Sequence, residues 1–117
     1  MKIPKPTDSA RALFDSLVPD DTRVEVKPMF GNLGAFVNGN MFMGVFGADV
    51  GVKLIETDQQ ALREAGGQPF GPEERPMSGY VSLPATFTQA TAKPWVDRSI
   101  EYIGGLPPKA KKAPKKR

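Results

Sequence analysis

The sequence predicts an α+β fold of two layers, in which an antiparallel sheet of about five strands packs against helices in the order α-β-β-β-β-α-β-α. Two observations carry this prediction. Between residues 23 and 54, four short apolar or alternating stretches are separated by turn signals, which is typical of a meander of strands. Stretches with a helical spacing of apolar residues precede and follow them. The 117 residues are enough for one hydrophobic core and not for two.

The first helix is expected at residues 8–18. Either Thr7 or Asp8 can cap it, because a short oxygen side chain accepts a hydrogen bond from a free amide of the first turn. Pro19 ends the helix, since proline cannot continue it. One apolar stripe is expected to face the core and consists of Ala10, Leu13, Phe14, Leu17 and Val18.

Residues 23–27 alternate between charged residues and valines, which predicts a half-buried strand that Pro28 limits in its pairing or ends. Residues 33–37 are apolar enough for a second strand. The next two residues, Asn38-Gly39, are the strongest hairpin signal in the chain, because a type I′ turn needs positive φ at both central positions.

Residues 41–46 return as the third strand, and residues 50–54 form a fourth after a turn at 47–49. The third strand is apolar on both faces and is therefore predicted to be central, with helix covering one side. Its two faces are expected to be Met41, Met43 and Val45 on one side and Phe42, Gly44 and Phe46 on the other.

A second helix is predicted at residues 57–65, opened by a capping box of Thr57 with Gln60. Its inward residues are expected to be Ala61, Leu62 and Ala65, before Gly66-Gly67 end it. Residues 68–77 are rich in proline, glycine and charge, which indicates an excursion at the surface.

Residues 79–83 form a short fifth strand that Pro84 ends. A last helix is expected to begin near Lys93, with Pro94 favourable in its first turn, and to end at Gly104-Gly105. Its inward side chains are predicted to be Trp95, Ser99, Ile100 and Ile103. We therefore expect one domain at residues 1–106, followed by a disordered tail of Lys, Ala and Pro at 107–117.

Composition removes several classes of site. The chain has no cysteine and no histidine. It therefore has no thiolate nucleophile, no histidine base, and neither thiolate nor imidazole as a metal ligand. No cofactor or metal is expected. The N-terminus lacks the apolar core of a signal peptide and no apolar run is long enough to span a membrane, which favours a cytoplasmic protein without a membrane partner.

The net charge of +3 hides a strong asymmetry. The tail holds six cations and no acid, which leaves 10 basic against 13 acidic residues in the rest of the chain, a net charge of −3. The sequence pI of about 9.3 is therefore a property of the tail. The six cations are Lys109, Lys111, Lys112, Lys115, Lys116 and Arg117.

Two groups of short motifs stand out by their order and spacing. The first group is Val26-Lys27-Pro28-Met29-Phe30-Gly31, Gly34, Phe36, Gly39, Met41-Phe42 and Lys53. The later group is Gly66, Pro69-Phe70, Met77, Tyr80, Leu83-Pro84 and Trp95. Taken together, from about residue 8 to 105, they resemble the TfoX (Sxy) N-terminal domain family.

This resemblance implies a two-layer α+β fold and, from the name-giving members, a co-activator of transcription in natural competence. Transcription machinery or a regulator would then be partners. Those members carry a second, helical C-terminal domain, so this chain is expected to be a stand-alone member with a basic tail instead. The family's glycine pair after Met-Phe is Gly31-Asn32 here, and Asn also tolerates positive φ.

The segment Met29-Phe30-Gly31 has two interpretations. Met and Phe make adaptable apolar contacts, so the segment can be a binding surface. We favour by about three to one the alternative that it plugs the core, because these residue types are usually buried. The glycines Gly31, Gly34 and Gly39 lie between predicted strands and no helix follows them, so a phosphate-binding loop is a poor interpretation.

An enzyme is not expected. No spacing links a nucleophile to a base, and acids scattered on loops are usually solvated. An enzyme would need a closed polar pocket around Asp49, Glu56 or Tyr80. The other candidates weighed are Asp58, Glu73 and Glu74 among the carboxylates and Ser78 and Ser82 among the hydroxyls.

The leading hypothesis is a non-enzymatic interaction module whose tail adds non-specific affinity for nucleic acid. No aromatic residue lies among the tail lysines, so base stacking and sequence readout are not implied. A solubilising tail, or one that folds back on the acidic body, is weighed equally. The alternative function is a protein-binding or self-associating domain, a homodimer included, whose partner docks on the sheet.

Overall fold

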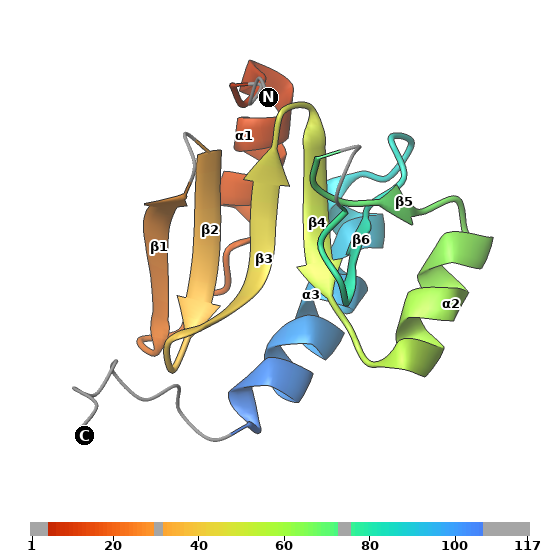
Figure 1. The fold of residues 1–117 in the computed structure, drawn as a ribbon. Coiled ribbons are helices and arrows are strands. Elements are labelled where there is room, and N and C mark those ends of the chain that lie inside the picture. Colours follow the sequence, from red (N-terminus) through yellow and green to blue (C-terminus); the bar gives the residue numbers. More distant parts are fainter. Residues whose placement is uncertain (1–4, 30–31, 73–75, 107–117) are drawn as a thin grey trace, which may run out of the picture.

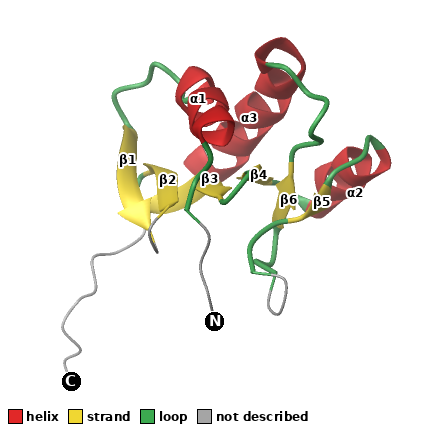
Figure 2. Cartoon of the chain, turned by 90° about the horizontal axis from the view of Figure 1, so that it is seen from above, coloured by secondary structure: helices red, strands yellow, loops and turns green. Residues whose placement is uncertain are grey.

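A computed structural model describes residues 5–29, 32–72 and 76–106, and all structural statements below concern these residues. Six antiparallel strands form one open sheet in the order β1-β2-β3-β4-β6-β5. The helices α1 and α3 lie side by side on one face of the sheet, and α2 lies beside the β5–β6 end (Figures 1 and 2). The predicted α+β class and element order are confirmed, with six strands rather than about five.

The elements follow in chain order. They are α1 (Asp8–Leu17), β1 (Val24–Met29), β2 (Asn32–Val37), β3 (Asn40–Phe46), β4 (Asp49–Lys53), α2 (Glu56–Glu64), β5 (Gln68–Pro69), β6 (Tyr80–Ser82) and α3 (Gln89–Gly104).

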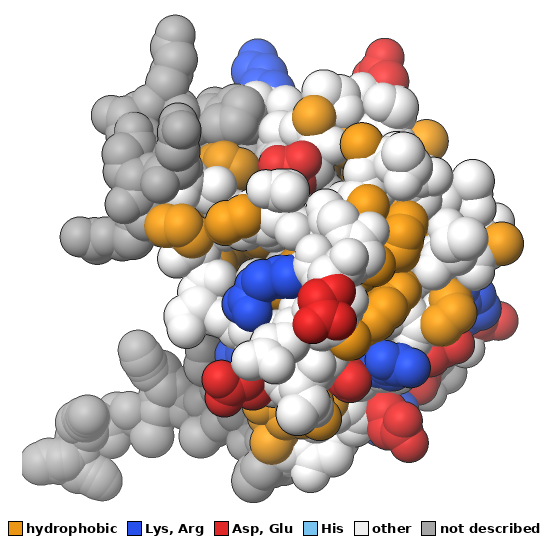
Figure 3. Space-filling model, turned by 90° about the vertical axis from the view of Figure 1, so that its right-hand side faces the viewer, with side chains coloured by type: hydrophobic (Ala, Val, Ile, Leu, Met, Phe, Trp, Pro, Cys, Tyr) orange, Lys and Arg blue, Asp and Glu red, His pale blue; other side chains and the backbone are white. Residues whose placement is uncertain are grey.

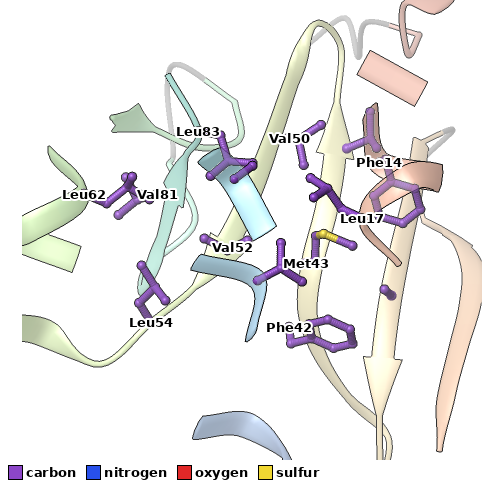
Figure 4. Packing of buried hydrophobic residues seen from close by; sticks show 14 of the residues in the cluster. Phe14, Leu17, Phe42, Met43, Val50, Val52, Leu54, Leu62, Val81 and Leu83 are labelled. Atoms are coloured by element: carbon purple, nitrogen blue, oxygen red, sulfur yellow. The ribbon is translucent and has the colours of Figure 1, made fainter. Parts of the chain in front are cut away.

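Two local signals in the first half of the chain act as predicted. Thr7 caps α1 by accepting a hydrogen bond from the amide of Ala10 at 3.1 Å. Asn38 and Gly39 have φ values of 53° and 81°, as the predicted type I′ turn requires. The core lies between the sheet and α1 with α3, where Phe14 and Leu17 of α1 pack toward Met43 of β3 (Figure 4).

A β-bulge corrects the predicted faces of β3. Ala35 pairs with Met43 and Phe36 pairs with Met41, so Phe42 has no partner in the β2 register. The extra residue brings Phe42 into the core beside Met43 and turns Met41 to the opposite face, against Gly34. The prediction that Met41 and Met43 share a face is therefore wrong.

The bulge explains a buried hydroxyl in α3. The hydroxyl of Ser99 lies 2.7 Å from the carbonyl oxygen of Phe42 and 2.7 Å from that of Lys53, and its single O–H proton is shared between these two acceptors. Ser99 is fully buried. Its hydroxyl thus serves a carbonyl that the bulge displaces and another at the end of β4, and ties α3 to both strands.

Three further predictions at strand and helix ends need correction. Of the two alternatives for Pro28, the one in which it ends the strand is wrong, because β1 continues to Met29. β1 is an edge strand, where a proline is tolerated. The capping box expected at Thr57 is absent, since α2 begins after Ile55 without a side-chain cap. Ala65, expected to face inward, is the exposed C-cap of α2.

The last helix begins four residues earlier than expected, at Gln89. A capping box of Thr88 with Thr91 sets this start, so Pro94 lies inside α3 rather than in its first turn. Trp95 and Ile100 are half-buried against the core. The segment 68–77, predicted as an excursion at the surface, has Gln68, Pro69 and Pro76 exposed, but it also contains the short strand β5 and the buried Phe70.

We predict that Ser99→Ala lowers the free energy of unfolding by about 1–3 kcal/mol, because two buried carbonyls lose their donor. Urea unfolding of the full chain measures it. The matched control is Ser16→Ala, which removes an exposed hydroxyl that donates to the carbonyl of Leu13 at 2.8 Å, and should cost less than about 0.5 kcal/mol. Equal costs for the two variants would contradict the bridging role.

Candidate interaction surface

The sheet face opposite α1 and α3, here called the outer face, has a row of glycines across its centre. The register pairs Gly34 of β2 with Gly44 of β3, and Gly44 with Gly51 of β4. The neighbours of these glycines along each strand point to the helices and lie in the core. The three central strands therefore contribute no side chains of their own to this row.

Phe70 fills part of the space above the glycines. A methyl group on Gly51 would overlap the Phe70 ring, and one on Gly44 would lie 3.6 Å from its tip. The sulfur of Met41 covers Gly34, where a methyl group would lie 2.8 Å from it. The glycine pattern thus serves close packing of side chains against the sheet backbone.

Aromatic rings join Phe70 in a second, smaller cluster on the outer face. Its ring centroid lies 6.4 Å from that of Phe46 and 5.9 Å from that of Tyr80. The Tyr80 hydroxyl donates to the carbonyl oxygen of Met41 at 2.9 Å. Burial raises the pKa of Tyr80 to about 12, because the phenolate would lose solvation there.

Two lysines of the outer face lie over aromatic rings. The ammonium of Lys27 is 4.7 Å from the centroid of Phe36, and that of Lys53 is 5.5 Å from the centroid of Tyr80. Lys27 also faces Glu25 at 3.9 Å. The outer face is the face of the sheet that α1 and α3 do not cover (Figure 2). It therefore combines cations with aromatic rings, of which Phe36 and Phe46 are partly exposed.

The structure separates the residues predicted from the family motifs. Gly34 and Tyr80 both belong to the outer face, on β2 and β6, whereas Gly39 forms the hairpin turn and Phe42 lies in the core. Gly34 and Gly39 are each followed by strand residues rather than by a helix. The remaining positions are Pro84, buried beside a cleft; Trp95, with the guanidinium of Arg98 4.7 Å from its ring; and Met29, in β1.

Phe30 and Gly31 lie outside the described residues, as do Glu73 and Glu74. The six cations of the tail, at 107–117, lie outside them too. The interpretations given to these positions stay predictions.

The structure brings two candidate hydroxyls, Ser78 and Tyr80, to one cleft, but no described candidate carboxylate lines that cleft with them. Asp49 lines a cleft of about 320 Å³ between α1 and residues 83–87, Tyr80 lines another of about 260 Å³, and Glu56 is exposed on α2. Burial raises the pKa of Asp49, and the hydrogen bonds from Arg23 lower the pKa of the exposed Asp21 to about 2. Within the described part of the chain, no three acidic side chains converge as a metal site would require.

Two polar residues that line the second cleft were not predicted as site residues from the sequence. Gln59 and Arg63 lie one turn apart on α2, and the guanidinium donates to the Gln59 side-chain oxygen at 3.1 Å. Their spacing of four on a predicted helix was the available signal. Phe70 belongs to the later motif group, but its burial was not predicted, because its neighbours have the composition of a loop.

The fold and the surface define a small α+β domain with a helix-covered face and an outer face of aromatic and cationic side chains. The TfoX N-terminal domain family matches residues 13–103, and the chain therefore belongs to this family. No curated protein matches the chain significantly. Of the described helices, none has the length and hydropathy needed to cross a membrane.

We predict that Tyr80 loses its proton only near pH 12 in the folded protein, against 10.0 for an ordinary tyrosine. Because the folded state holds this proton more tightly than the unfolded state, the stability linked to it is present below pH 10 and is lost as the pH rises toward 12. Tyrosinate absorbance measures the titration. Tyr80→Phe should remove the late step and Tyr102→Phe should keep it; a Tyr80 step near pH 10 would contradict the burial argument.

Proposed function

We propose that this protein is a binding module without chemistry of its own, acting in the cytoplasm in transcription or competence regulation, and that its tail supplies non-specific affinity for nucleic acid. The observation that carries the proposal is the segregation of charge. Six of the 16 basic residues stand in the last nine positions, and the rest of the chain is net acidic. Such a segment displaces counterions from a phosphate backbone.

Charge in the body supports assigning this affinity to the tail. On the side that carries α2, Lys and Arg side chains are interspersed with Asp and Glu, without a continuous basic patch (Figure 3). Several described cations already face carboxylates. These ion pairs are Arg23–Asp21 at 2.8 Å, Lys27–Glu25 at 3.9 Å, Lys93–Asp97 at 3.4 Å and Arg98–Asp58 at 3.3 Å.

The chemistry of the chain supports binding rather than catalysis. The sequence holds no histidine or cysteine, and the described carboxylates that line a cleft do so singly. A general acid and base pair would need two such groups within reach of one substrate.

The second candidate is a module that docks a protein, a second copy included, on the outer face. The half-buried Phe36 and Met41, with Lys27 over the ring, favour it. Pairing through the free edge of β1 is disfavoured, because Pro28 has no N–H and the N–H of Val24 already bonds to the carbonyl of Asp21 at 2.9 Å. A partner would therefore use side chains of the outer face rather than strand addition.

Replacing the six tail cations by glutamine should remove most binding to duplex DNA of arbitrary sequence. For the wild type, six phosphate contacts predict a log–log salt slope of about −5 and a Kd of roughly 10⁻⁴ to 10⁻⁶ M. Fluorescence anisotropy of a labelled duplex across a salt series measures both quantities.

The matched control replaces the five tail lysines by arginine, which preserves charge and should preserve the slope. Binding that is unchanged by the glutamine variant, or absent in the wild type at low salt, would contradict the role of the tail. Either result would favour the protein-docking candidate.

A further inference from the structure

The cleft of about 260 Å³ lies between α2 and the chain that leads into β6, at the end of the sheet where α2 packs (Figure 1). One wall comes from a single helix turn and the other from a tight turn in which Gly79 has φ of 87°. The lining residues are Gln59, Arg63, Pro69, Pro76, Met77, Ser78, Gly79 and Tyr80.

A neutral amide holds the guanidinium at this cleft. The side-chain nitrogen of Gln59 donates to the carbonyl of Leu54 at 2.8 Å, which fixes the orientation of the amide. Its oxygen is thereby left to accept from Arg63 at 3.1 Å. Because that partner is uncharged, it positions the guanidinium without neutralising it, and the other N–H groups of the planar fork stay available.

Among the described residues that line the cleft, Arg63 carries the charge. No acidic residue is among its described lining residues, and Arg63 has no carboxylate partner there, unlike Arg23 and Arg98, which each pair with an aspartate. Lys53 packs its side chain against Gly79 and holds its ammonium 5.5 Å from the centroid of the Tyr80 ring, so a second cation contacts two residues that line the cleft. Ser78, a residue with a hydroxyl donor, lines the cleft as well.

We infer that this cleft binds a compact oxyanion, the carboxylate or phosphate group of a small ligand, with Arg63 as its principal contact and Gln59 as a positioning residue. An oxyanion of this kind accepts two parallel hydrogen bonds from a guanidinium. The volume lies just under the range of about 300–1,000 Å³ typical of drug-sized ligands, which favours a small occupant. The inference is independent of the tail and does not rest on the proposed function.

The test is an NMR titration of the ¹⁵N-labelled full chain with inorganic phosphate, and in a second arm with acetate, at an ionic strength held constant with chloride. We expect saturable shifts of the amides of Ser78, Gly79 and Tyr80 and of the Arg63 side-chain nitrogen. Arg63→Gln should weaken binding about tenfold or more. Saturation by phosphate alone would identify a phosphate site, and saturation by both anions a general oxyanion site.

Two variants separate charge from geometry. Arg63→Lys keeps the charge and loses the planar fork, and Gln59→Ala keeps the arginine and loses its anchor, so both should bind more weakly than the wild type. The control Arg11→Gln removes an exposed cation of α1 and the same net charge, and should leave the affinity unchanged. The amide spectrum of each variant reports whether it is folded.

Three outcomes would overturn the inference. They are shifts confined to the tail residues 107–117, the absence of saturation by either anion, and equal weakening by Arg63→Gln and Arg11→Gln. The first leaves the nucleic-acid proposal intact, and loss of DNA binding by the tail variant leaves this inference intact, so the two proposals fail separately.

Discussion

The packing of the outer face depends on one contact, in which the Phe70 ring lies against the backbone of Gly51. A central strand must bury both faces, and α1 and α3 cover only one. On the other face the glycine row leaves room for a ring that arrives from outside the sheet. Phe70 is 1% exposed there, although it lies in a stretch of proline, glycine and charge.

That contact also positions the chain around the oxyanion cleft. Phe70 directly follows β5, whose Pro69 carbonyl accepts a hydrogen bond from the hydroxyl of Ser82 at 3.2 Å. Before β5, Gly67 lies so close to β6 that a methyl group on it would be 2.7 Å from the Val81 side chain. The hydrogen bond to Pro69 and this close packing of Gly67 hold the end of α2 against the sheet. Helix α2 in turn carries Gln59 and Arg63 of the cleft.

Local sequence signals were sufficient to predict an element where they agreed with its packing in the fold. The Asn38-Gly39 turn and the apolar stripe of α1 were predictable, because each needs only neighbouring residues. The bulge at Phe42 was not, since nothing in an alternating apolar run marks an extra residue. Phe70 could not be assigned either, because its burial depends on Gly51, 19 positions away in the sequence.

The site was less predictable than the fold. The packing of Phe70 against the glycine row depends on a strand register that only the paired strands reveal. Gln59 and Arg63 looked like an ordinary solvent-exposed helix pair. Their distinction comes from the Leu54 carbonyl, which orients the amide, and from the absence of a carboxylate among the described residues that line the cleft.

The central claim is that the glycine row exists to admit Phe70, and a double-mutant cycle on Gly51 and Phe70 tests it most directly. Urea unfolding should show that Gly51→Ala costs about 1–3 kcal/mol, because the added methyl overlaps the ring, whereas Gly44→Ala costs clearly less. In a Phe70→Leu background, where a smaller side chain can yield, the cost of Gly51→Ala should fall by at least about half. The claim is contradicted if Gly51→Ala is tolerated as well as Gly44→Ala, or costs the same in both backgrounds.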